Sequence, residues 1–89
     1  MAVIVSADVS GMDQAMNEGM IGQFRPAIVA SDGFILHLGH AIDGGWRVTE
    51  VWDSRSAWQS WYDGTVKPNL PRGMEPTISV QDAHTVVTP

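Results

Sequence analysis

A histidine and a glutamate in neighbouring segments of this sequence have the residue types needed for general-base chemistry. His37 lies in the apolar segment Phe34–Ile42 and Glu50 lies in Trp46–Trp52, with Asp43-Gly44-Gly45 between them. Such a sequence indicates a β-hairpin, and a two-residue turn places positions 37 and 50 opposite each other. The carboxylate then orients the imidazole and supports its charge, as a general-base pair requires. A three-residue turn instead directs His37 to the other face of the sheet, and no pair forms.

His84 is a second candidate base, because it falls in the segment Thr77–Val87, which is typical of a strand. The alternation of a strand places His84 on the same face as Ile78 and Val80. That face is turned either to a pocket or to a partner subunit. The ordinary alternative for both candidate histidines is a structural role in the core or at an interface, with Glu50 forming a salt bridge in a dimer.

The spacing of His37 and His40 would suit a metal site on a helix but not on a strand. Residues three apart on a strand lie on opposite faces, so the two imidazoles cannot bind one ion. The sequence contains no cysteine and no other cluster of metal-binding side chains. We therefore predict neither a metal site nor a bound cofactor.

Large aromatic side chains are abundant, with four tryptophans in 89 residues. Trp58, Trp61 and Tyr62 recur at helical spacing between Ser54 and Lys67, and Met12, Met16 and Met20 lie on the other expected helix. Aromatic walls suit a flat, conjugated ligand, although a stripe of this kind also forms ordinary core. The predicted substrate-binding residues are Trp52, Trp58, Trp61, Tyr62 and Met16.

The order of the expected elements defines the fold class. Strands are expected at Ala2–Ala7, Phe34–Ile42, Trp46–Trp52 and Thr77–Val87. A first helix has apolar positions from Met12 to Met20 and is capped by Ser10. It is weakened after Gly19 and is followed by a loop from Pro26. A second helix runs from its cap at Ser54 to Lys67-Pro68. This β-α-β-β-α-β order predicts a single α+β domain, residues 1–89, with a ferredoxin-like fold. Its four-stranded antiparallel sheet carries both helices on one face.

The other face of that sheet is predicted to be covered by a second copy of the chain. Ala2 and Ile4 lie on one side of the first strand, whereas Val3 and Val5 lie on the other. The strand Phe34–Ile42 is likewise apolar on both sides, with Phe34, Leu36 and Leu38 on one and Ile35, His37, Gly39 and Ala41 on the other. A sheet with one wet face alternates apolar and polar residues. The absence of that alternation predicts a symmetric homodimer, in which two sheets form an α/β barrel.

Charge and hydropathy exclude several classes of function. Ten acidic and five basic residues give a formal charge of −5, and the basic residues are scattered. Nucleic-acid binding requires clustered positive charge, so no nucleic-acid partner is expected. The apolar runs are too short to span a bilayer, and no signal peptide is visible. These features, with the lack of cysteine, predict a soluble cytoplasmic protein.

Several segments resemble a known group of proteins. They are Gly33–Gly39, Asp43–Ser54, Ala57-Trp58, Val66–Leu70 and Ala83–Val87, of which the strand-to-helix passage GWRVTEVWDS is the most specific. The chain resembles the small dimeric α/β barrel proteins related to antibiotic-biosynthesis monooxygenases. The resemblance implies the fold described above and a pocket between the sheet and the helices of each subunit. His40 departs from the pattern, because relatives have a small or turn residue there, and no asparagine follows His84.

Three functions are compatible with these features. The first is a cofactor-independent enzyme, a monooxygenase or a polyketide cyclase or isomerase, acting on an aromatic or polyketide-like substrate. His37 or His84 is then the base, and Glu50 orients it. The second is a non-catalytic dimeric ligand-binding or accessory protein of the same fold. The third is a haem-binding protein with a histidine as axial ligand.

Overall fold

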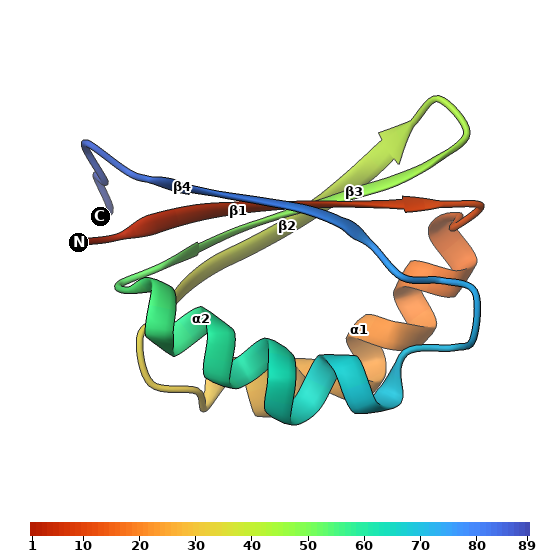
Figure 1. Cartoon of the computed structure of the whole chain (residues 1–89), viewed down its shortest axis with the longest axis horizontal. Coiled ribbons are helices and arrows are strands. Elements are labelled where there is room, and N and C mark those ends of the chain that lie inside the picture. The colour runs from red at the N-terminus through yellow and green to blue at the C-terminus, as the bar shows by residue number, and fades with distance from the viewer.

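One antiparallel sheet and two helical segments make up the computed structural model, which describes residues 1–89 (Figure 1). The strands follow the spatial order β2-β3-β1-β4, and both helices cover the same face. The elements are β1 (Val3–Ser10), α1 (Gln14–Val29), β2 (Phe34–Ile42), β3 (Gly45–Trp52), α2 (Arg55–Trp61) and β4 (Thr77–Asp82). This is the predicted ferredoxin-like β-α-β-β-α-β arrangement, and the fold class is confirmed.

The β2–β3 hairpin sets the register on which the candidate site depends. Ile42 pairs with Gly45, so the turn has two residues, and Gly44 takes a positive φ of 75°. Glycine adopts this conformation without the steric penalty of a side chain, which explains its presence in the turn. With this register, His37 lies directly opposite Glu50. The predicted two-residue turn is confirmed.

A β-bulge at the start of β2 changes which side chains face the helices. The register shifts between Phe34 and Leu36, so an extra residue interrupts the alternation. Phe34 and His37 both lie on the helix side as a result, although they are three residues apart: Phe34 packs against the core and His37 lines a cavity. The strict alternation expected from the sequence, with Phe34 on the face of Leu36 and Leu38, is therefore wrong at this end of the strand.

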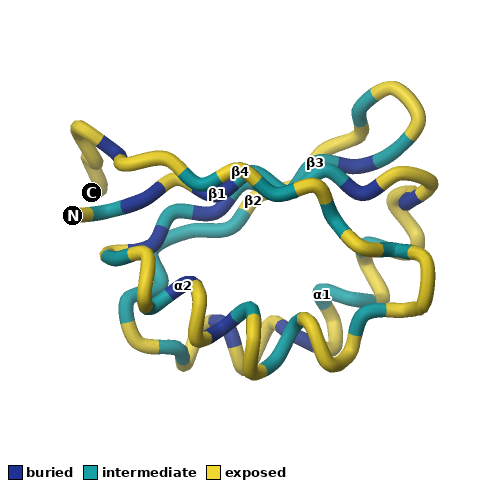
Figure 2. Tube along the Cα trace, viewed as in Figure 1, coloured by how far each residue is buried: buried dark blue, intermediate teal, exposed yellow.

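The hydrophobic core lies between the sheet and the helices. Figure 2 shows buried residues on β1 and β3 and on the facing sides of the helical segments. Trp52 is fully buried at its centre, and a smaller cluster of Val9, Met12 and Trp46 extends the core. Each large apolar side chain removed from water contributes about 1.5–3 kcal/mol. The main cluster consists of Val3, Val5, Phe24, Ile28, Trp52, Trp58 and Trp61.

Helix α1 begins later and ends later than the sequence suggests. Ser10 pairs with Gly45 in the sheet, so the N-cap is Asp13, whose Oδ1 accepts a hydrogen bond from the Met16 amide at 2.9 Å. The helix continues to Val29 with Pro26 inside it. The predicted cap at Ser10 and the loop from Pro26 are therefore wrong.

Packing explains why the second half of α1 stays helical. Phe24 and Ile28, four residues apart, are the buried residues of this helix. The Phe24 ring contacts Trp61 edge-on, with ring centroids 6.1 Å apart. Burial of this stripe outweighs the low helix propensity of glycine and proline.

Helix α2 has the cap that the sequence predicts. The Ser54 Oγ accepts a hydrogen bond from the Ala57 amide at 3.1 Å. After Trp61 the chain widens into a π-helical turn (Tyr62–Val66) and tightens into a 3₁₀ turn (Lys67–Asn69) that contains Pro68. The helical segment thus ends close to the predicted Lys67-Pro68. π-turns occur often beside functional sites, and this one lies against the cavity described below.

Strand β4 is shorter than expected and ends at Asp82. Its pairing stops there because Asp82 is opposite Val3, the first residue of β1. The Ala83 amide still bonds the Ala2 carbonyl at 2.8 Å, but the following residues leave the sheet. The predicted strand to Val87 is wrong, and His84 is not part of a strand. None of the helices has the length and hydrophobicity to cross a membrane.

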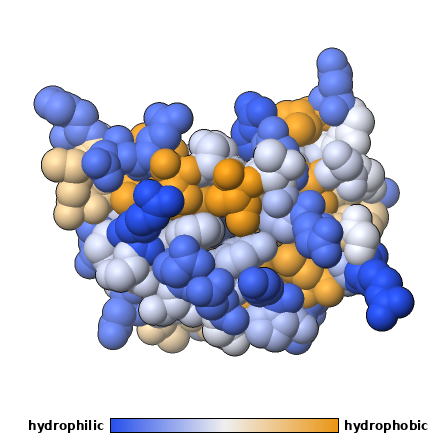
Figure 3. Space-filling view, viewed as in Figure 1, coloured by the Kyte–Doolittle hydropathy of each residue, from blue (hydrophilic) through white to orange (hydrophobic).

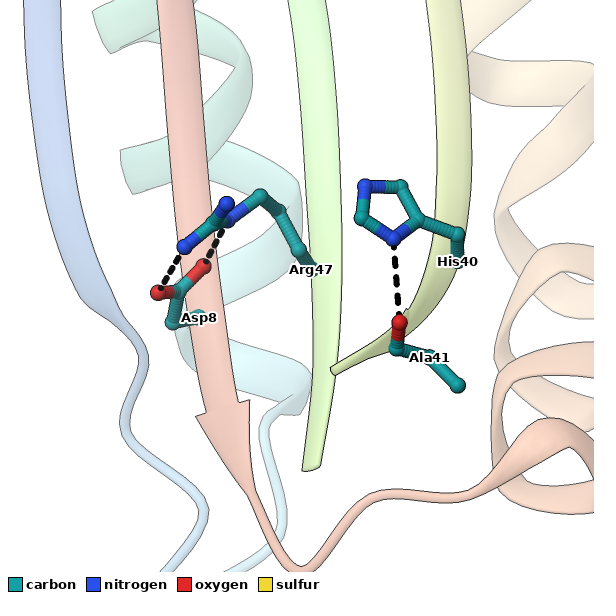
Figure 4. Close-up of polar contacts among 4 residues, drawn as sticks. All are labelled: Asp8, His40, Ala41 and Arg47. Carbon is teal, nitrogen blue, oxygen red and sulfur yellow. Dashed lines mark hydrogen bonds and ion pairs between the residues drawn. The ribbon is translucent and has the colours of Figure 1, made fainter. Parts of the chain in front are cut away.

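The face of the sheet opposite the helices is apolar at one end and polar at the other. Ile4, Val51 and Leu36 form one row across β1, β3 and β2, and the neighbouring Leu38 is 49% exposed. At the other end Asp8, Arg47 and His40 form a second row (Figure 4). Figure 3 views the sheet edge-on, and this side of the molecule also shows hydrophobic patches separated by hydrophilic side chains. The expectation of two apolar faces holds for only part of the sheet.

Candidate functional site

A cavity of about 100 Å³ lies between the sheet and the helices. Its walls come from all four strands, both helical segments and the chain before β4, and they are mainly apolar. The polar side chains that reach it are Asn17, His37, Glu50 and Tyr62. A ligand in this space meets apolar walls and a few polar groups at defined positions, the usual composition of a small-molecule site.

His37, Glu50 and Trp52 form a chain of hydrogen bonds at the sheet side of the cavity. The His37 Nδ1 lies 2.7 Å from Glu50 Oε2, and the Trp52 Nε1–H donates to Glu50 Oε1 at 2.9 Å. Glu50 is only 7% exposed, and the His37 side chain is 19% exposed. Both carboxylate oxygens therefore have a donor, as a buried carboxylate requires.

The hydrogen bond to Glu50 determines which nitrogen of the neutral His37 imidazole carries the proton. An ionised carboxylate only accepts hydrogen bonds, so the proton of the neutral imidazole lies on Nδ1. The other ring nitrogen, Nε2, forms no hydrogen bond in the structure. Because His37 lines the cavity, the imidazole is positioned to accept a proton from a bound molecule. The predicted pairing of His37 with Glu50 is confirmed as geometry.

The local sequence explains how a charged group comes to be buried here. Glu50 alternates with Trp46, Val48 and Trp52 along β3, and all of them face the helices. Val5 is its neighbour on β1. A carboxylate among such neighbours destabilises the fold unless it is paired, and the two donors provide that pairing.

Of the four aromatic residues predicted to bind substrate, three line the cavity and one supports it from beneath. Trp58, Trp61 and Tyr62 line the cavity, and Trp58 stacks on Tyr62 with ring centroids 5.4 Å apart. Trp52 does not reach it; instead it packs beneath Trp61 at 6.2 Å and holds Glu50. Burial, followed by the charges of Asp63 and Glu75, raises the pKa of the Tyr62 phenol, which therefore stays protonated at neutral pH.

Two of the predicted site residues lie elsewhere. Met16 is 39% exposed and does not line the cavity, because α1 turns Met20, Phe24 and Ile28 inward instead. Met12 and Met20 are the methionines that line it. His84 follows the end of β4, is exposed, and its Nδ1 lies 2.7 Å from the Thr85 hydroxyl. The structure thus does not bring Met16 or His84 to the pair of His37 and Glu50.

His40 lies on the opposite face of the sheet from His37, as its spacing predicts. Its Nδ1 lies 3.0 Å from the Ala41 carbonyl oxygen, to which it donates when Nδ1 carries the proton. Figure 4 shows His40 beside the ion pair of Asp8 and Arg47, in which Arg47 donates to both carboxylate oxygens at 2.7 and 2.9 Å. No group of three histidine, aspartate or glutamate side chains is placed to hold a metal ion.

Sequence reasoning missed a second hollow, a groove of about 430 Å³ between α1 and the edge strand β2. Its α1 wall includes Ile21, Arg25 and Val29, at positions four residues apart. The signal was present in the sequence, because these residues form one helical stripe. The stripe does not stand out in the sequence, because the helix is expected to weaken after Gly19 and to end before Pro26.

The fold and the site define a class of protein: a two-layer α+β domain of the ferredoxin-like type, with a mainly apolar cavity between its layers. No family model and no curated protein matches the sequence. Solved structures do match the fold of the chain.

Three of these structures show how widely the fold occurs. SnoaB, a cofactor-independent oxygenase from Streptomyces nogalater, matches with a TM-score of 0.69 and 14% identity, covering 97% of this chain and 95% of that one. A haem-degrading protein from Mycobacterium tuberculosis matches with a TM-score of 0.68 and 16% identity, covering 99% and 100%. A protein of unknown function from Nitrosomonas europaea matches with a TM-score of 0.67 and 13% identity, covering 99% and 92%. At these identities the likeness establishes the fold, which is the fold that the sequence resemblance implies.

Proposed function

We propose that this protein is a small cofactor-independent enzyme of the monooxygenase or cyclase type. Its substrate is an aromatic or polyketide-like molecule bound between the helices and the sheet. The observation that carries the proposal is the buried chain of His37, Glu50 and Trp52 at the edge of an otherwise apolar cavity. The fold neighbour SnoaB, a cofactor-independent oxygenase, supports the same class of reaction.

The first step is removal of a proton from an acidic C–H or O–H group of the substrate. His37 accepts this proton at Nε2, and the negative charge of Glu50 stabilises the imidazolium that forms. The hydrogen bond from Trp52 keeps the carboxylate turned toward the imidazole. Trp58 and Trp61 supply apolar surface on which a conjugated ring packs. General-base catalysis of this kind contributes about 10²–10⁴-fold to the rate.

In an oxygenase, the substrate carbanion is the reductant of O₂. The carbanion carbon forms a bond to O₂, and the resulting peroxide takes up the proton held by His37. Loss of water from this hydroperoxide, with removal of the second hydrogen from the same carbon, leaves a carbonyl group. One CH₂ group and one O₂ thus yield one C=O group and one water. A cyclase or isomerase uses the same base without O₂.

The matched substitutions His37→Ala and His40→Ala test the proposal. Both remove an imidazole from β2, but only His37 faces the cavity. With anthrone as substrate, we expect O₂ uptake and quinone formation to fall about 10²–10⁴-fold in the His37 variant. The His40 variant should retain the wild-type rate. His37→Gln keeps a polar side chain of similar size and serves if the alanine variant folds poorly.

The result decides between enzyme and binding protein. Equal rates in the two variants would contradict a role of His37 as base. Binding of anthrone without turnover of it or of other enolisable polycyclic ketones, with or without O₂, would instead support a non-catalytic binding or accessory protein. Tryptophan fluorescence reports that binding directly, because two of the four tryptophans line the cavity.

Haem binding is a second candidate, favoured by the unbonded Nε2 of His37 at the cavity and by the haem-degrading fold neighbour. About 100 Å³ is below the ~300–1,000 Å³ of typical ligand sites, so haem, like a multi-ring substrate, needs space beyond the cavity. Addition of haemin is the test. A Soret shift that disappears in His37→Ala would support this function over the first.

We further propose that the protein is a homodimer that pairs through the open face of the sheet. The apolar row of Ile4, Leu36 and Val51, with Leu38 beside it, lies on the face that no helix covers. A chain of this length buries only about 60–65% of the surface that its unfolded form exposes, and association is a common source of additional stability. A second copy covers this row by placing the same residues against it.

A further inference from the structure

The groove between α1 and β2 adjoins the cavity that holds the proposed base. Ile21, Ile28 and His37 line both hollows. The groove lies at the edge of the sheet, because β2 is the outermost strand on that side. A molecule in the groove therefore reaches the same imidazole as a molecule in the cavity.

The two volumes favour a multi-ring substrate that extends from the cavity into the groove. The cavity of about 100 Å³ is well below the ~300–1,000 Å³ of typical ligand sites, whereas the groove of about 430 Å³ lies within that range. One ring fills the cavity at most. The rest of a larger substrate that reaches His37 lies along Val29 and Phe34 in the groove.

Arg25 gives this groove a chemical preference. It is the one basic residue of the chain, apart from the histidine, that lines either hollow. Arg47 is already held by Asp8, whereas Arg25 forms no salt bridge. In a chain of net charge −5, an anionic ligand is repelled over most of the surface and attracted where a free guanidinium lies. The planar guanidinium binds a carboxylate through two parallel hydrogen bonds.

We infer that the groove is the outer half of the substrate site and that Arg25 binds an acidic substituent of the substrate there. The substrate class is accordingly an aromatic or polycyclic carboxylic acid, whose ring reaches His37 while its carboxylate pairs with Arg25. This inference rests on the proposed function, because it uses the same cavity and the same base.

Two probes of the same shape test the inference. Anthracene-2-carboxylate and 2-(hydroxymethyl)anthracene differ in charge, and each quenches tryptophan fluorescence when it binds near the aromatic wall. We compare their dissociation constants for the wild-type protein, Arg25→Gln and Arg55→Gln. Arg55 is the matched control, because it is an exposed arginine on α2 that lines neither hollow.

We expect the wild type and Arg55→Gln to bind the carboxylate more tightly than the alcohol. In Arg25→Gln this preference should fall by about three- to tenfold, the range of a charge-assisted hydrogen bond at a partly exposed site. Affinity for the alcohol should be unchanged. Added salt should weaken binding of the carboxylate probe and leave binding of the alcohol unchanged.

Each other outcome has a defined meaning. If both probes bind and the Arg25 substitution leaves the preference intact, the inference fails while the proposed cavity site stands. If neither probe binds the wild type, both the inference and the proposed substrate class fail. Arg25→Lys keeps the charge and should retain part of the preference, which separates loss of charge from loss of packing.

Discussion

Two pairs of acidic and basic side chains lie on opposite faces of the same sheet, and their surroundings differ. His37 and Glu50 face the helices, whereas Arg47 and Asp8 face outward. Each pair joins neighbouring strands with a nitrogen-to-oxygen distance of 2.7 Å. The first pair is largely buried and the second is more than a third exposed. Geometry alone therefore does not separate a candidate catalytic pair from an ordinary surface ion pair.

Burial is the property that suits the inner pair, and not the outer one, to act as a base. Water screens the charges of Asp8 and Arg47, so their attraction contributes little to folding. Glu50 lies among apolar side chains, where a missing partner leaves an uncompensated polar group. The low local dielectric also strengthens the effect of its charge on His37. The same cross-strand motif is thus a solvated contact on one face and a positioned base on the other.

The largest difference between the faces is expected from removing the two acids. Glu50→Ala leaves the donors of His37 and Trp52 unpaired and opens a small void, so we expect a loss of about 2–4 kcal/mol in the free energy of unfolding. Asp8→Ala, on the open face, should change it far less. Urea denaturation of both variants measures the comparison. Equal losses would show that burial does not distinguish the two pairs.

Glu50→Gln sharpens the same comparison without a void. The amide can still accept from Trp52, but it no longer carries the charge that supports an imidazolium at His37. We expect a stability loss of about 1–2 kcal/mol, smaller than for alanine, and a fall in anthrone oxidation of at least tenfold. Stopped-flow oxidation assays and urea denaturation on one preparation separate the two effects. Full activity in this variant would contradict the role proposed for the carboxylate.

The apolar end of the open face provides the next test. Leu38→Lys places a charge within the surface proposed to join two copies, where it would lose its hydration on association. We expect the dimer dissociation constant to rise by about tenfold or more, as for a substituted interface anchor. Val87→Lys, at an exposed position in the C-terminal tail, is the control. Light scattering over a concentration series measures the change, and a monomeric wild type would contradict the proposed dimer.

Most of the fold could be predicted because it follows from local signals. The Asp43-Gly44 turn, the Ser54 cap and the strand Phe34–Ile42 are specified by residues close to one another in the sequence. The course of α1 past Pro26 could not be read in this way. It depends on the contact of Phe24 with Trp61, a residue on the other helix. Propensity favours a break there, and tertiary packing overrides it.

The candidate site could be predicted only in its centre. The pairing of His37 with Glu50 follows from the length of one turn, and the sequence indicates that turn clearly. Trp52 was expected to touch the substrate, but the structure uses its indole N–H to hold Glu50. Arg25 was missed because a groove arises where two elements meet, and no local pattern describes it. Residues that act through distant neighbours leave little trace in a single sequence.

The smallest expected effect concerns pH and the outer pair. The hydrogen bonds from Arg47 hold the pKa of the Asp8 carboxyl below its usual value of 3.8. A lowered pKa in the folded protein stabilises the fold above the unfolded pKa, and this stabilisation is lost as the pH falls through the folded value. We therefore expect Asp8→Asn to be slightly less stable than the wild type at pH 6, with a smaller difference at pH 3, below the unfolded pKa. Urea midpoints at the two pH values measure it, and 0.5 M salt should shrink the difference at pH 6, because the pair is exposed to solvent. A difference at pH 6 that persists unchanged at high salt would show that the outer pair is shielded, as it would be beneath a second copy of the sheet.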